Sequence, residues 1–253
     1  LISQRDKSRV LFEPMKAVIG ARVSGISLAD VPNVDTVELI EHALEKYGVL
    51  VFSDQVITPQ QQVVFSAAFA ELELTELEDA RLEGAEEIFV VGNVGKGLVS
   101  FSPRDADQEL EWHTDHIHRQ VAARASLLYA LEVPTEGGDT LFACMYSAFD
   151  SLDDAEKRRY CDIEAINSSW GLERYLTEQG LGESEGSAGR RAQDSMVRPL
   201  VRRHPLTGRR ALYFGNQVTV CLVGESEATS RSFIAAPTAS KMDMGAGLRG
   251  DSL

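Results

Sequence analysis

From residue 71 onward, the apolar residues of this chain occur in short runs that are separated by Gly, Pro, Asp and Asn. Runs of this length between turn-forming residues are typical of strands. The sequence therefore predicts a fold that is mainly β with flanking helices. The expected strands are residues 88–91, 126–133, 140–145 and 211–214.

The amino-terminal part mixes strand and helix patterns. Residues 17–28 alternate well enough to predict a strand pair, and residues 48–52 form a short apolar run typical of a buried strand. Between them, residues 34–46 carry apolar side chains at helical spacing. The expected buried stripe of this helix is Val37, Leu39, Ile40, Ala43 and Leu44. A second helix is predicted to start with Thr58 as its N-cap and Pro59 at its first position.

Length and charge limit the classes of protein to consider. A chain of 253 residues suits one large domain, here expected to span residues 1–253. The net charge of -14 argues against nucleic-acid binding, because affinity for phosphate backbones depends on clustered Lys and Arg. Eight carboxylates lie within residues 71–87 and are expected to be solvated. No apolar stretch approaches the roughly 18 residues of a membrane-spanning helix.

The three cysteines have no metal-binding or disulfide spacing. Cys144, Cys161 and Cys221 are scattered without a CxxC pair, which indicates a reducing compartment. The first residues lack both an initiator Met and the apolar core of a signal peptide. Cytoplasmic localisation is the expectation by elimination.

The segment Trp112-His113-Thr114-Asp115 carries the candidate chemistry. If this segment is extended, His113 and Asp115 project from one face and can hold one metal ion. An imidazole and a carboxylate suit non-haem Fe(II), which takes two histidines and one carboxylate and keeps other positions open. The alternative is a surface pair next to Trp112.

The other histidines are poorer candidates for ligands. On an extended strand, His116 and His118 would point to the face opposite His113 and Asp115. His204 precedes Pro205 in a turn and is expected to be structural, and His42 is expected to be exposed on the first helix. A zinc hydrolase is disfavoured because the chain has no HExxH motif.

Five blocks of the sequence, in order, resemble the taurine and phenoxyacetate dioxygenase (TauD/TfdA) family over about residues 17–233. The blocks are residues 47–52 with Gln55, the helix with Gln60 and Gln61, residues 112–115, residues 134–142 with Gly-Gly-Asp-Thr, and residues 204–210. The resemblance implies a double-stranded β-helix (jelly roll). It also implies a dioxygenase that uses Fe(II), 2-oxoglutarate and O₂ to oxidise a small, often anionic, substrate and releases succinate and CO₂.

The same resemblance implies roles for four residues. His113 and Asp115 match the first two iron ligands. Thr140 matches a residue that hydrogen-bonds the 2-oxoglutarate carboxylate, although on its own it is a turn residue after Gly-Gly. Asn93 matches a polar residue beside the substrate, and a turn-forming Asn is the alternative.

The family pattern is not matched after residue 234. The expected distal histidine, and the arginine that pairs with the far carboxylate of 2-oxoglutarate, are not found in residues 235–253. These nineteen residues contain no Val, Ile, Phe, Tyr or Trp, so they are not expected to supply core strands. We therefore expect a jelly roll that is incomplete at its carboxyl end, with an unpaired edge that favours instability or a homo-oligomer. The alternative to an active enzyme is a non-catalytic remnant that acts as a binding module.

Overall fold

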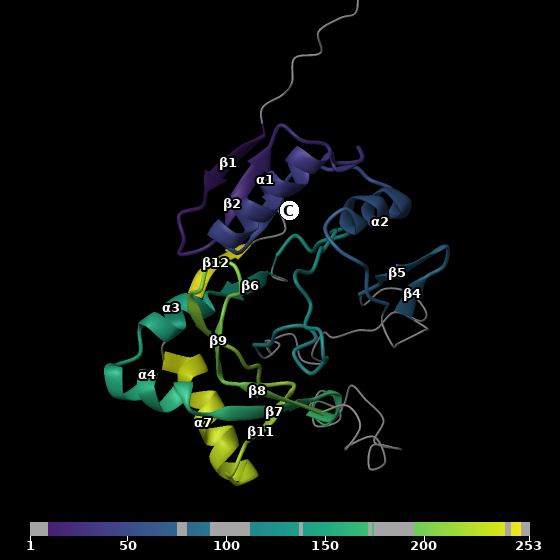
Figure 1. Cartoon of the computed structure of the whole chain (residues 1–253). Coiled ribbons are helices and arrows are strands. Elements are labelled where there is room, and N and C mark those ends of the chain that lie inside the picture. The colour runs from purple at the N-terminus through teal and green to yellow at the C-terminus, as the bar shows by residue number, and fades with distance from the viewer. Residues whose placement is uncertain are drawn as a thin grey trace, which may run out of the picture.

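Short strands and helices are interspersed along the chain in the computed structural model (Figure 1). The structure describes residues 10–74, 80–91, 112–136, 139–171, 174, 195–240 and 244–248. Within this part, the strands form small sheets of two or three members. The described residues thus mix helix and strand, and the expectation of a mainly β chain is met only in part.

The amino-terminal layer is a three-stranded sheet covered by α1 (Val34–Tyr47). Strand β2 (Ala21–Ser24) pairs antiparallel with β1 (Leu11–Pro14) and parallel with β3 (Leu50–Phe52). Parallel pairing requires a crossover, which α1 provides. Helix α1 confirms the helix predicted for residues 34–46. Its burial differs in part, because Ile40 and Ala43 are buried but Leu39 is 41% exposed.

The first strand pair differs from its prediction. The pair expected within residues 17–28 is instead made by β2 and the preceding β1. A glycine allows the turn between them, because Gly20 has φ of 105°, a conformation that side chains rarely adopt.

Helix α2 (Pro59–Ala67) begins as predicted. The Thr58 side chain accepts from the backbone of Gln61, and the Gln61 side chain accepts from the backbone of Thr58, which forms a capping box. Buried Phe65 packs against Phe69, with ring centroids 5.3 Å apart. The hairpin of β4 (Arg81–Leu82) and β5 (Ala85–Phe89) follows.

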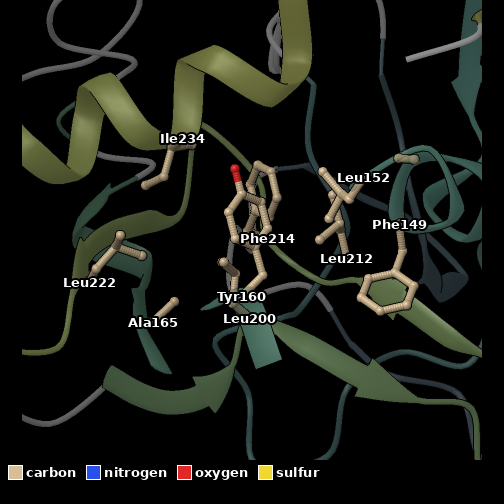
Figure 2. Packing of buried hydrophobic residues seen from close by; sticks show 10 residues of the cluster. Phe149, Leu152, Tyr160, Ala165, Leu200, Leu212, Phe214, Leu222 and Ile234 are labelled. Atoms are coloured by element: carbon tan, nitrogen blue, oxygen red, sulfur yellow. The ribbon is translucent and has the colours of Figure 1, made fainter. Parts of the chain in front are cut away.

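The carboxyl-terminal layer contains the main hydrophobic core. Strand β7 (Glu164–Ser168) lies between β8 (Ser195–Pro199) and β11 (Thr219–Leu222). Strands β9 (Val201–Arg203) and β10 (Arg210–Leu212) form a hairpin. The helices α3 (Met145–Asp150), α4 (Asp154–Cys161) and α7 (Glu227–Ser240) pack on these strands. The side chains that converge between them are Ala148, Phe149, Leu152, Tyr160, Ala165, Leu200, Leu212, Phe214, Leu222 and Ile234 (Figure 2).

Residues 235–253 were not expected to supply core strands, and the structure describes one short strand among them. Helix α7 continues to Ser240, and β12 (Met244–Leu248) pairs antiparallel with β6 (Thr140–Ala143) (Figure 1). Pairing depends on backbone N–H and C=O groups, which Gly, Ala and Met also carry, so the lack of β-branched residues does not prevent it.

The strand predicted for residues 126–133 is also absent, although the structure describes all of these residues. Leu127, Leu128 and Leu131 in this segment are exposed. A strand needs a partner, and no pairing of this segment is found within the described part of the chain. The strand predicted for residues 140–145 is shorter than expected, because α3 starts at Met145. No helix in the described residues is long and apolar enough to cross a membrane.

Candidate functional site

His113 and Asp115 lie side by side at the surface. His113 Nε2 is 3.7 Å from Asp115 Oδ1, and the two side chains are 42% and 51% exposed. Divalent metals bind N and O donors at about 2.1 Å, so donors in adjacent octahedral positions lie about 3.0 Å apart. A small side-chain rotation would bring the two donors from 3.7 Å to this separation. The extended strand predicted here is wrong, because residues 112–114 are irregular and residues 115–118 form a turn.

The two oxygens of the Asp115 carboxylate have different neighbours. Oδ1 faces His113, whereas Oδ2 accepts a hydrogen bond of 2.6 Å from Ser126 Oγ. A bond from a hydroxyl to an ionised carboxylate is short and strong. Ser126 therefore restricts the rotation of the Asp115 side chain.

Backbone contacts hold the segment that carries His113. The Asn216 N–H donates to the carbonyl oxygen of Trp112 across 3.0 Å. At the preceding residue, a Cβ built on Gly215 would lie 3.0 Å from His113 Cα and 3.2 Å from Thr114 N. A side chain at position 215 would therefore be tight, and the His113 backbone would have to move by a few tenths of an ångström to admit it.

A buried polar network fixes Gly215 in turn. Its N–H donates to Thr219 Oγ1 at 3.0 Å, and the Thr219 hydroxyl donates to Asn167 Oδ1 at 2.7 Å. Asn167 Nδ2 then donates to the Ala165 carbonyl at 3.2 Å. Asn167 is fully buried, so its amide depends on these partners. The network connects the candidate site to β7 and β11.

Arg198 of β8 holds the turn that follows Asp115. Its guanidinium donates to the carbonyl oxygens of Ile117 at 2.7 Å, of Gln120 at 3.1 Å, and of Arg119. Ile117 itself is fully buried. The turn is therefore held by the hydrogen bonds of the Arg198 guanidinium and by burial of the Ile117 side chain.

Glu73 binds the same turn from the amino-terminal side. Its Oε2 is 2.6 Å from His116 Nδ1, and its Oε1 is 3.3 Å from Arg119 Nη1. His116 has φ of 52°, and its ring meets that of His118 edge-on at 6.2 Å. His116 and His118 therefore lie in a turn and not on the extended strand that was predicted to point them away from His113 and Asp115. The His116 ring is held by its contact with the Glu73 carboxylate.

The sequence also predicted roles for Thr140, Asn93 and His204. Thr140 is half-buried at the start of β6, where it pairs with Leu248 of β12. Asn93 lies outside the described residues. His204 is structural as predicted, since its backbone accepts from Gly208 and its Nδ1 accepts from Thr207 N–H.

The described residues bring two candidate metal donors together but no third. Among them, no three His, Cys, Asp or Glu side chains gather closely enough to hold a metal ion. The imidazole and carboxylate that do meet, His113 and Asp115, are donor types that Fe(II) accepts. The pair thus fits part of a non-haem iron site.

Comparison with known proteins decides the family. Residues 11–237 match the family described as "Taurine catabolism dioxygenase TauD, TfdA family". The chain belongs to the TauD/TfdA family. It is 32% identical over 215 residues to the (S)-phenoxypropionate/alpha-ketoglutarate-dioxygenase of Sphingobium herbicidovorans, covering 80% of this chain and 69% of that protein. It is 30% identical over 232 residues to the pentalenolactone F synthase of Streptomyces arenae, covering 87% of this chain and 75% of that one.

A solved TauD/TfdA-like structure has the same fold. The crystal structure of AAD-2 in complex with Mn(II) and N-oxalylglycine superposes with a TM-score of 0.70 at 25% identity, covering 94% of this chain and 82% of AAD-2. N-Oxalylglycine is an analogue of 2-oxoglutarate. TauD/TfdA enzymes use Fe(II) and 2-oxoglutarate, so the family's cofactors are those that the sequence predicted.

The residues that support the pair were not predicted as functional. Glu73 was part of an acidic stretch expected to be solvated, and Ser126 was the start of an expected strand. Arg198 gave no local signal, because its role depends on contacts with residues far away in the sequence. Only Gly215-Asn216 directly after a strand could have indicated a close backbone approach.

Proposed function

We propose that this chain is an Fe(II)- and 2-oxoglutarate-dependent dioxygenase that oxidises a small, anionic organic substrate, with release of succinate and CO₂. The observation that carries the proposal is the 3.7 Å approach of His113 Nε2 to Asp115 Oδ1 in a TauD/TfdA fold. An anionic substrate is favoured because the Sphingobium relative is named for phenoxypropionate, a carboxylate.

Four side chains have roles in this proposal. His113 Nε2 and Asp115 Oδ1 hold the metal, and the Thr140 hydroxyl donates to the carboxylate of 2-oxoglutarate. Asn93 lies outside the described residues, and only the family resemblance assigns it a place beside the substrate. The bound metal and 2-oxoglutarate supply the oxidising chemistry, whereas the protein binds and orients the reactants.

Two arginines near the pair are already engaged by carboxylates. Arg119 meets Glu73 at 3.3 Å, and Arg124 Nη1 is 2.7 Å from Glu41 Oε1 of α1. We therefore do not assign Arg119 or Arg124 to the anionic group of the substrate. Their ion pairs instead connect residues 119–124 to α1 and to the segment after α2.

The proposal treats residues 1–253 as one catalytic domain whose reactants are a small molecule and O₂. A net charge of -14 disfavours nucleic acid as a partner. Cytoplasmic localisation is part of the proposal and agrees with the three cysteines, which are free thiols.

A second candidate is a non-catalytic binding module. One observation favours it, namely that the described residues bring only two metal donors together. Such a protein would bind a metal weakly and would not consume 2-oxoglutarate. The two candidates therefore differ in turnover.

Turnover of 2-oxoglutarate tests the proposal. Purified protein with Fe(II), O₂ and 2-oxoglutarate is given (S)-phenoxypropionate or its uncharged methyl ester, and succinate is measured. The proposal expects succinate formation that the acid stimulates more than the ester does. His113→Ala abolishes it, whereas His42→Ala, which removes an exposed histidine on α1, does not. Succinate formation that is the same in His113→Ala and in the unaltered protein overturns the site, and none in the folded unaltered protein favours the binding module.

A further inference from the structure

The Asp115 carboxylate is held asymmetrically. Oδ2 accepts the 2.6 Å hydrogen bond from Ser126 Oγ, whereas Oδ1 faces His113 Nε2 at 3.7 Å. Rotation of the carboxylate would break the bond to Ser126 and move Oδ1 away from the imidazole. Oδ2 is thus hydrogen-bonded within the protein, whereas Oδ1 lies on the side of His113.

The position of Ser126 is itself fixed by its neighbours in the chain. On one side, Arg124 pairs with Glu41 of α1 at 2.7 Å. On the other side, the Tyr129 hydroxyl donates to the Gln55 carbonyl at 3.2 Å and accepts from the Ile57 N–H at 3.4 Å. These contacts anchor the segment to the amino-terminal layer. The position of Ser126 is therefore determined by these contacts and not only by its hydrogen bond to Asp115.

We propose that Ser126 is a positioning residue that orients Asp115 so that Oδ1, and not both oxygens, binds the metal. This inference rests on the proposed function. A carboxylate that binds through one oxygen leaves a coordination position that a chelating carboxylate would fill, and 2-oxoglutarate and O₂ need such positions. Groups that hydrogen-bond to metal-binding side chains commonly change metal affinity when they are removed.

Metal affinity tests the inference without turnover. Co(II) is titrated into the full chain, and both the affinity and the visible absorption spectrum of the bound ion are recorded, because the spectrum reports the ligand geometry. Ser126→Ala is expected to lose about 10- to 100-fold in affinity and to change the spectrum. Ser126→Thr keeps the hydroxyl and is expected to restore both. Ser151→Ala is the matched control, since it removes a 2.8 Å hydroxyl bond to the Ala148 carbonyl at the end of α3.

The outcomes separate the inference from the proposed function. If Ser126→Ala binds Co(II) with unaltered affinity and spectrum while His113→Ala does not bind, the inference is overturned and the proposed function stands. If His113→Ala binds as tightly as the unaltered protein, both are overturned. If Ser126→Thr is as weak as Ser126→Ala, or if Ser151→Ala is equally weak, the loss is not due to the hydroxyl at position 126 and the inference is overturned.

Discussion

Asn216 donates its backbone N–H to the carbonyl oxygen of Trp112 across 3.0 Å and so ties the loop before β11 to the segment that carries His113. The adjacent Gly215 packs against the His113 backbone. The position of His113 is therefore set by β7 and β11 as well as by its own sequence neighbours. Changes in that loop should therefore alter metal binding, because they would shift the backbone that carries His113.

Gly215→Ala should weaken metal binding. The new Cβ would lie 3.0 Å from His113 Cα, so the metal-binding segment has to shift. Overpacking of this kind costs about 1–3 kcal/mol of stability. Co(II) affinity and the free energy of unfolding would both be measured. Leu212→Ala in the core, expected to cost about 2–5 kcal/mol, is the control and should leave the affinity of the folded protein unchanged. Unaltered affinity in Gly215→Ala would contradict this account.

Thr219→Val should lower the free energy of unfolding by about 1–3 kcal/mol, because it leaves buried hydrogen-bonding groups unpaired. Those groups are the Gly215 N–H and Asn167 Oδ1. Chemical denaturation measures the change. Thr229→Val removes an exposed 2.8 Å contact between the Thr229 and Ser226 hydroxyls at the start of α7, and it should cost less because water can replace the lost hydroxyl. Equal effects of the two substitutions would show that the network contributes nothing.

Arg198→Lys should loosen the turn at residues 117–120. A lysine has one point of contact and cannot reproduce the planar fork that reaches three carbonyl oxygens. Hydrogen exchange of the amides in this turn should become faster. Arg202→Lys on β9 is the comparison, since Arg202 stacks on the Tyr213 ring at 4.5 Å and does not contact the turn. If exchange in the turn is unchanged in Arg198→Lys, Arg198 does not hold it.

Removal of metal should lower stability. A metal that binds only the folded state adds about 2.7 kcal/mol when its concentration is one hundred times Kd. Thermal unfolding would be followed with Mn(II) and then with a chelator. The shift should vanish in His113→Ala and persist in His42→Ala. A shift that survives in His113→Ala would place the metal elsewhere.

Local features of the fold could be predicted from the sequence. The N-cap at Thr58 and the helix from Val34 depend on interactions within a few residues, so short patterns reveal them. Strands depend on distant partners. Residues 126–133 have a strand-like composition but no pairing in the described part of the chain, whereas Met244–Leu248 pairs with β6 despite two glycines.

In the candidate site, too, the local pair could be predicted from the sequence, whereas the distant supporting residues could not. His113 and Asp115 were predicted to meet because they are two positions apart, and they do meet although the backbone turns after Thr114. The contacts that support them come from Ser126, Arg198 and Gly215. No periodicity or motif in one sequence encodes such long-range contacts, so Ser126 and Arg198 could be identified only in the structure.

Anaerobic titration of the purified protein with Fe(II) and 2-oxoglutarate tests the central claim most directly. A keto acid chelated to Fe(II) gives a visible charge-transfer band. We predict a saturable band that is lost in His113→Ala and retained in His42→Ala. A folded, unaltered protein that gives no band would contradict the assignment of an Fe(II) and 2-oxoglutarate site to this chain.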